Sequence, residues 1–85
     1  MYFIANWKMY GNLKSLNTLN KVIKFSKSKE IKKGRLIYCP PYTLISPFLK
    51  KFENCLIDIG GQNCHESEDY GSHTGFVNSK MLKSS

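Results

Sequence analysis

The sequence predicts an α/β fold built on a parallel sheet. Short apolar runs rich in β-forming residues alternate along the chain with segments whose apolar residues recur at helical spacing. A strand-helix-strand rhythm implies parallel strands that are joined by right-handed crossovers. Three such strands leave two unpaired edges and an uncovered face, so we expect the 85 residues to be the beginning of a larger fold.

The first strand is expected over residues 2–5, an apolar run that polar Asn6 ends. An amphipathic helix is expected from about Ser15 to Lys27, closing near Gly34. Most of its lysines lie on the side opposite its apolar stripe, which consists of Leu16, Leu19, Val22, Ile23 and Phe25.

The second strand is expected over residues 36–39, where Pro40-Pro41 stops it because proline cannot donate to a strand ladder. The next helix is expected over residues 43–52. Pro47 is tolerated only in or near a first turn, so this helix should begin irregularly. Its apolar stripe consists of Leu44, Ile45, Phe48, Leu49 and Phe52.

The third strand is expected over residues 56–59 and is followed by Gly60-Gly61. Residues 62–75 form a polar loop that includes three closely spaced acids. A last helix is expected to begin at Asn78, because asparagine is a favourable N-cap residue, and to be cut off at Ser85.

The chain is basic, with 13 Lys and Arg against six Asp and Glu and a formal charge of +7. Eight of these bases lie between Lys14 and Arg35, where Glu30 is the only acid. Such a pattern is typical of a solvated helix face. The alternative is a small basic nucleic-acid-binding module. The basic residues, however, lack the interleaved aromatic residues or the helix-turn-helix spacing that would recognise nucleobases.

The three cysteines, Cys39, Cys55 and Cys64, are an odd number at irregular spacing, which argues against a secreted disulfide framework. Reduced thiols and a cytoplasmic location are therefore expected. No stretch approaches the ~20 apolar residues of a membrane span, and no basic segment precedes an apolar one at the N-terminus. Neither a membrane nor a targeting step is expected.

Asn6 and Lys8 follow the first strand at a spacing of two, which predicts that both side chains point to the same side. In α/β folds the carboxyl ends of parallel strands are where ligands bind. A lysine there could place a positive charge on a phosphate or on an enolate-like oxygen. The alternative is a lysine that only extends its ammonium group into solvent.

Four ordered segments of the chain resemble the triosephosphate isomerase family, and together they extend over nearly all of it. They are Ala-Asn-Trp-Lys-Met-Tyr-Gly (5–11), Cys-Pro-Pro-Tyr-Thr (39–43), Gly-Gly-Gln-Asn (60–63) and Gly-Ser-His-Thr-Gly (71–75). Met81-Leu82-Lys83 resembles the start of that family's third helix, and Tyr10 replaces its usual asparagine. Each segment has the family's spacing.

The resemblance implies a (β/α)8 TIM barrel, of which residues 1–85 would be about the first three βα units of one domain, with the third helix truncated. It implies an enzyme that interconverts dihydroxyacetone phosphate and glyceraldehyde 3-phosphate through an enediol or enediolate. The enzyme would act in glycolysis and gluconeogenesis, as a homodimer, without a metal or an organic cofactor.

By motif position, the resemblance makes Lys8 the catalytic residue of this chain and makes Asn6, Trp7 and Lys8 substrate-binding. Gln62 and Asn63 would support the loop that follows the first strand and carries Lys8 (the lysine loop) and, with Thr74, would belong to the dimer interface. Phe76 departs from the glutamate that is common after Thr-Gly, so any ion pair made by that glutamate is lost.

The family's glutamate base and histidine electrophile match no position of this sequence, so the chain alone is expected to be inactive. His65 and His73 lie in the loop after the third strand and are not expected to replace them. Potential metal ligands do gather in that loop, at Cys64, His65, Glu66, Glu68, Asp69 and His73. Their spacing matches no zinc pattern, so a solvated polar loop is the expected interpretation.

Overall fold

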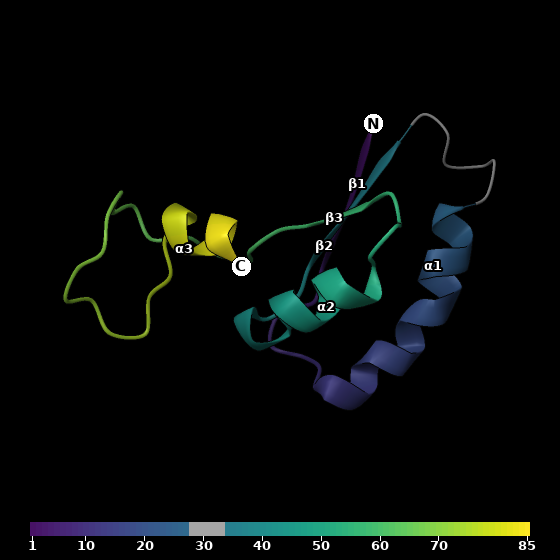
Figure 1. Cartoon of the computed structure of the whole chain (residues 1–85), viewed down its shortest axis with the longest axis horizontal. Helices are drawn as coiled ribbons and strands as arrows, with labels where there is room; N and C mark the ends of the chain where they lie inside the picture. Colours follow the sequence, from purple (N-terminus) through teal and green to yellow (C-terminus); the bar gives the residue numbers. More distant parts are fainter. Residues whose placement is uncertain (28–33) are drawn as a thin grey trace.

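The computed structural model describes residues 1–27 and 34–85 and contains the predicted parallel sheet (Figure 1). Its strands are β1 (Tyr2–Asn6), β2 (Arg35–Cys39) and β3 (Ile57–Ile59), in the order β1-β2-β3. Both strand pairs are parallel. The predicted α/β class is confirmed, although Leu56 lies outside β3 and is 89% exposed.

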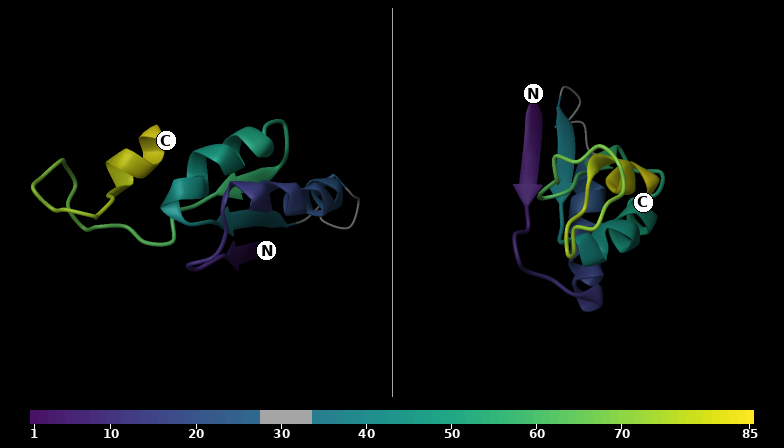
Figure 2. Two further views of the ribbon diagram at one scale, coloured as in Figure 1. Left: turned by 90° about the horizontal axis from the view of Figure 1, so that it is seen from below. Right: turned by 90° about the vertical axis from the view of Figure 1, so that its left-hand side faces the viewer.

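The helices that connect the strands lie on one face of the sheet (Figure 2). They are the 3₁₀ helix η1 (Leu13–Leu19) with α1 (Asn20–Ser26), and the 3₁₀ helix η3 (Tyr42–Leu44) with α2 (Ile45–Lys51). A sequential strand order with right-handed crossovers places every connecting helix on the same face. The opposite face carries an exposed Ile4 and an ion pair of 2.6 Å between Arg35 and Asp58. Closing such a sheet into a barrel would enclose that face.

The first helical segment begins two residues before the predicted start, because Asn12 caps it. The Oδ1 atom of Asn12 accepts a hydrogen bond of 3.0 Å from the Lys14 N–H, and the Ser15 hydroxyl accepts one of 3.0 Å from the Asn12 N–H. This reciprocal arrangement is a capping box. The segment changes from 3₁₀ to α geometry at Asn20 and ends at Ser26. Part of the predicted basic stretch lies outside the described residues, namely Lys29, Glu30, Lys32 and Lys33.

Two residues were wrongly assigned to the apolar stripes. Phe25 is 45% exposed and Leu49 is 41% exposed. In α1 the helical repeat that starts from buried Leu19 continues through positions 22 and 23 to Ser26, which is buried in place of its neighbour Phe25. The hydroxyl of Ser26 is satisfied locally by donating to the Ile23 carbonyl, at 2.7 Å.

The second helix begins irregularly, as predicted. The backbone passes through η3 before α geometry starts at Ile45, and Pro47 is the third residue of α2. Proline is accepted there because the first N–H groups of a helix have no intrahelical acceptor.

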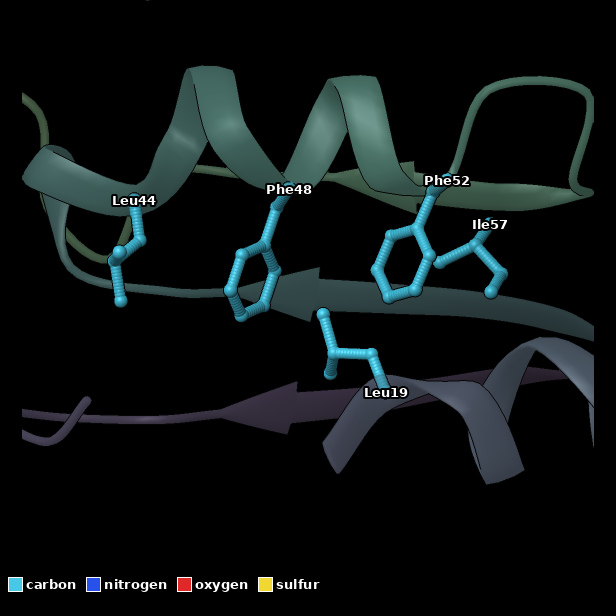
Figure 3. Close-up of a cluster of buried hydrophobic side chains, with 5 residues drawn as sticks. All are labelled: Leu19, Leu44, Phe48, Phe52 and Ile57. Carbon is cyan, nitrogen blue, oxygen red and sulfur yellow. The ribbon is translucent and has the colours of Figure 1, made fainter. Parts of the chain in front are cut away.

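The core lies between α2, η1 and the sheet (Figure 3). Phe48 is completely buried, and its ring lies edge-on to those of Trp7 and Phe52, at centroid distances of 5.0 and 5.7 Å. Aromatic pairs favour this arrangement. Since Trp7 immediately follows β1, its contact with Phe48 anchors the start of the following loop to the core. The buried residues of this core cluster are Leu19, Leu44, Phe48, Phe52 and Ile57.

The segment 62–77 extends away from the sheet before α3 (Ser79–Ser84) begins (Figures 1 and 2). Asn78 caps α3, as predicted: its Oδ1 accepts from the Met81 N–H at 3.0 Å. Its Nδ2 donates to the Asp69 carbonyl at 3.0 Å. The buried Asn78 side chain therefore joins the middle of the segment to the start of the helix.

Candidate active site

The carboxyl ends of the three strands meet at one edge of the sheet, where the predicted site residues follow them. Asn6, the last residue of β1, is in register with Cys39, the last residue of β2. The Trp7 N–H donates to the Cys39 carbonyl at 3.0 Å. On the other side of β2, the Gly60 N–H donates to the Tyr38 carbonyl at 2.9 Å. The segments after β1 and β3 are thus both tied to β2.

Lys8 has a left-handed backbone conformation, with φ of 55°. For a residue with a side chain this conformation costs about 1–2 kcal/mol, so surrounding contacts must hold it. One is a hydrogen bond of 2.8 Å from the Lys8 N–H to Oδ1 of Asn6. The strand ends at Asn6, so the two-residue alternation used to orient Lys8 from the sequence does not extend to it.

Gln62 provides the second contact to Lys8. Its Nε2 atom donates to the carbonyl of Lys8 at 2.7 Å and to that of Cys39 at 2.9 Å. A primary amide has two N–H groups, and both are used here. One side chain from the segment after β3 therefore connects the lysine loop with the end of β2. The structure brings Asn6, Trp7, Lys8 and Gln62 together.

Asn63 lies beside this group and contacts Tyr42. The Tyr42 hydroxyl donates to the Asn63 carbonyl, while the Asn63 Oδ1 accepts from the Cys64 N–H at 2.9 Å. The sequence reasoning assigned no role to Tyr42. An aromatic residue directly after Pro40-Pro41 was its only signal, and that signal does not reveal a partner 21 residues away.

Thr74 is an exposed residue of the segment 62–77, which extends away from the sheet (Figure 1). His65 and His73 belong to the same segment, where their ring centroids are 4.4 Å apart and Phe76 lies 5.1 Å from His65. The Nδ1 atom of His65 accepts from the Ser67 N–H at 3.1 Å. These histidines thus make local contacts within the segment. The dimer contact assigned to Thr74 stays a prediction.

Asp69 accepts a hydrogen bond from the Lys80 ammonium at 2.9 Å, and this bond, followed by one from the Tyr70 N–H, lowers the pKa of its carboxyl group. Because this pKa is lowered, the contact contributes fully to the stability of the folded state at pH values above the ordinary aspartate pKa. That contribution is lost as the pH falls through the lowered pKa of Asp69. We expect Lys80→Ala to raise the pKa of Asp69 toward its ordinary value, as measured by an NMR pH titration. Lys83→Ala, on the same helix, should leave it unchanged; a pKa that stays low without Lys80 would contradict the assignment.

Within residues 1–27 and 34–85, no three His, Cys, Asp or Glu side chains are grouped so that they could hold a metal ion. No helix in these ranges has the length and apolar character needed to cross a membrane. Cys39, Cys55 and Cys64 are free thiols.

The family model described as triosephosphate isomerase matches residues 1–85. The chain belongs to the triosephosphate isomerase family. A crystal structure of the Bartonella henselae triosephosphate isomerase superposes with a TM-score of 0.84 at 34% identity. The superposition covers 98% of this chain and 33% of that one, so the sheet and its helices match the N-terminal part of a TIM barrel.

Curated triosephosphate isomerases give the same result. The Wolbachia pipientis wMel enzyme is 41% identical over 84 residues, which are 94% of this chain and 31% of that relative. The Bartonella tribocorum enzyme is 34% identical over 82 residues, or 96% and 32%. The chain therefore spans about a third of the length of the curated relatives it matches. None of these relatives favours the nucleic-acid-binding alternative.

Proposed function

We propose that residues 1–85 form the first three βα units of a single TIM-barrel domain and provide the lysine loop of a triosephosphate isomerase active site. The reaction is the interconversion of dihydroxyacetone phosphate and glyceraldehyde 3-phosphate through an enediol or enediolate, in glycolysis and gluconeogenesis. The observation that carries this proposal is the left-handed Lys8, held through its backbone by Asn6 and Gln62 at the carboxyl ends of parallel strands.

Lys8 acts through charge. Its backbone hydrogen bonds leave the ammonium group available, and the side chain is exposed. A lysine ammonium is a compact positive charge with three donors, which suits both the substrate phosphate and the oxygen that becomes negative in the enediolate. Because the backbone is held in advance, little reorganisation is needed when that charge develops. Asn6 positions the lysine and the substrate, and Trp7 anchors the loop to the core.

Proton transfer requires further groups. Triosephosphate isomerase is a standard example of pKa tuning, in which a glutamate is the base and a neutral histidine polarises the carbonyl. Neither role is assigned to a residue of this chain, since His65 and His73 contact each other in the segment 62–77. We therefore place base and electrophile in the remaining part of the barrel.

The proposed enzyme is a cytoplasmic homodimer that needs no metal or organic cofactor and binds no nucleic acid. Thr74, Gln62 and Asn63 are its proposed interface residues in this chain. The projection of the segment 62–77 away from the sheet supports the assignment of Thr74, because an extended loop can reach a second subunit (Figure 2).

A chimera tests the proposal. Residues 1–85 replace the matched N-terminal third of the Wolbachia pipientis wMel enzyme, with which they share 41% identity. We expect the chimera to isomerise glyceraldehyde 3-phosphate in a coupled assay and the 85-residue chain alone to be inactive. Turnover by the chain alone, above that of its Lys8→Ala variant, would contradict the division of roles. A folded but inactive chimera would contradict the proposed function.

A further inference from the structure

Gln62 must be placed accurately, because its side-chain amide donates hydrogen bonds to carbonyl groups of two different segments. The backbone that leads to it is held at Gly60, whose N–H donates to the Tyr38 carbonyl, but it then passes through Gly61, and glycine has the largest conformational freedom of any residue. The strand β3 ends before these glycines, at Ile59. Some contact beyond the glycines must therefore restrict the backbone around Gln62.

Tyr42 makes such a contact. Its hydroxyl donates to the carbonyl of Asn63, the residue directly after Gln62. Tyr42 itself comes from a well-restrained part of the chain, since Pro40 is buried and Pro41 has φ of −53° and ψ of 152°. A proline ring restricts φ, and a tyrosine side chain has only two soft torsions to order. The donor is thus presented with little conformational freedom.

Asn63 is also restrained on its other side, where its Oδ1 accepts from the Cys64 N–H at 2.9 Å. The two bonds hold the Asn63–Cys64 peptide group, one residue after Gln62, while the Gln62 side chain holds Lys8 and Cys39. The contacts therefore form one continuous series from the Tyr42 hydroxyl to the left-handed backbone of Lys8.

We propose that Tyr42 is a positioning residue: its hydroxyl holds Asn63, which places Gln62, which in turn keeps Lys8 in its left-handed conformation. The consequence for catalysis rests on the proposed function. The structural relation between Tyr42, Gln62 and Lys8 is independent of it. Two measurements separate these two parts.

The first measurement uses the 85-residue chain and Tyr42→Phe, which removes only the hydroxyl. In ¹⁵N-resolved NMR spectra, the side-chain amide of Gln62 and the backbone amide of Lys8 are expected to shift or broaden. Tyr70→Phe is the matched control, because Tyr70 lies in the segment 62–77 and is 70% exposed. Unchanged Gln62 and Lys8 signals in Tyr42→Phe would overturn the proposal.

The second measurement is a double-mutant cycle in the chimera. A hydrogen bond is worth about 0.5–1.5 kcal/mol, so Tyr42→Phe should lower kcat/KM by roughly 2- to 12-fold when Lys8 is present. In a Lys8→Ala background it should have no further effect, since Tyr42 acts through that lysine. Equal losses in both backgrounds would overturn the positioning role.

The two parts can fail separately. An inactive chimera would contradict the proposed function, and the amide spectra of the 85-residue chain would then decide the role of Tyr42. Conversely, an active chimera whose kcat/KM is the same with Tyr42 and with phenylalanine would contradict the positioning role and leave the proposed function intact.

Discussion

Lys8→Ala in the chimera is expected to lower kcat for glyceraldehyde 3-phosphate by about 10²- to 10³-fold, the usual loss when one preorganised charge-stabilising group is removed. The structure indicates that this substitution removes the ammonium group without removing the backbone contacts of residue 8. Asn6 and Gln62 contact the backbone N–H and carbonyl of Lys8, which alanine retains. The left-handed conformation is equally strained in alanine. The variant therefore loses the ammonium group while its loop keeps the same supports.

Lys21→Ala is the matched control for this loss of one positive charge. Lys21 is an exposed residue of α1, one of the helices that cover one face of the sheet. Its loss should change kcat by less than about twofold, since an exposed charge far from the reaction is largely screened. Steady-state kinetics at constant ionic strength measure both variants. Similar activity of Lys8→Ala and Lys21→Ala would contradict the catalytic role of Lys8 and show that its ammonium group is only solvated.

Phe48→Ala is expected to destabilise the chain by about 3–5 kcal/mol, because it removes a completely buried ring and leaves a cavity. At 0.05–0.15 kcal/mol per residue, a folded chain of 85 residues has a total stability of roughly 4–13 kcal/mol. A chain of this size belongs near the lower end, so the free energy of unfolding of the variant should fall close to zero and a large fraction of its molecules should be unfolded. The ring contact with Trp7 would be lost as well, which also releases the start of the lysine loop.

Phe25→Ala is the matched control, since it makes the same chemical change at a ring that is 45% exposed. It should cost less than about 1 kcal/mol, because a surface ring loses little burial and leaves no closed cavity. Urea unfolding followed by far-UV circular dichroism gives the free energy of unfolding for both variants. Equal losses for Phe48→Ala and Phe25→Ala would show that the cluster in Figure 3 is not the stabilising core.

Local patterns predicted the order of the elements well. Proline stopped β2, and Pro47 restricted the start of α2, because both effects act within a few residues. The same patterns failed where a choice depended on neighbours. Phe25 and Leu49 are apolar yet largely exposed, since the core side of each helix is already occupied by residues at better helical spacing.

By itself, the sequence determined the family of this chain, the parallel α/β arrangement and the chemical groups, Asn6 and Lys8, that follow the first strand. Only the tertiary structure decided how these groups are held. The carbonyl of Lys8, whose φ is positive, accepts a hydrogen bond from Gln62, which lies 54 residues further along the chain. The tether between Tyr42 and Asn63 spans 21 residues. Periodicity reports which face of an element is buried, whereas hydrogen bonds between distant segments leave no periodic signal and arise only once the strands have paired.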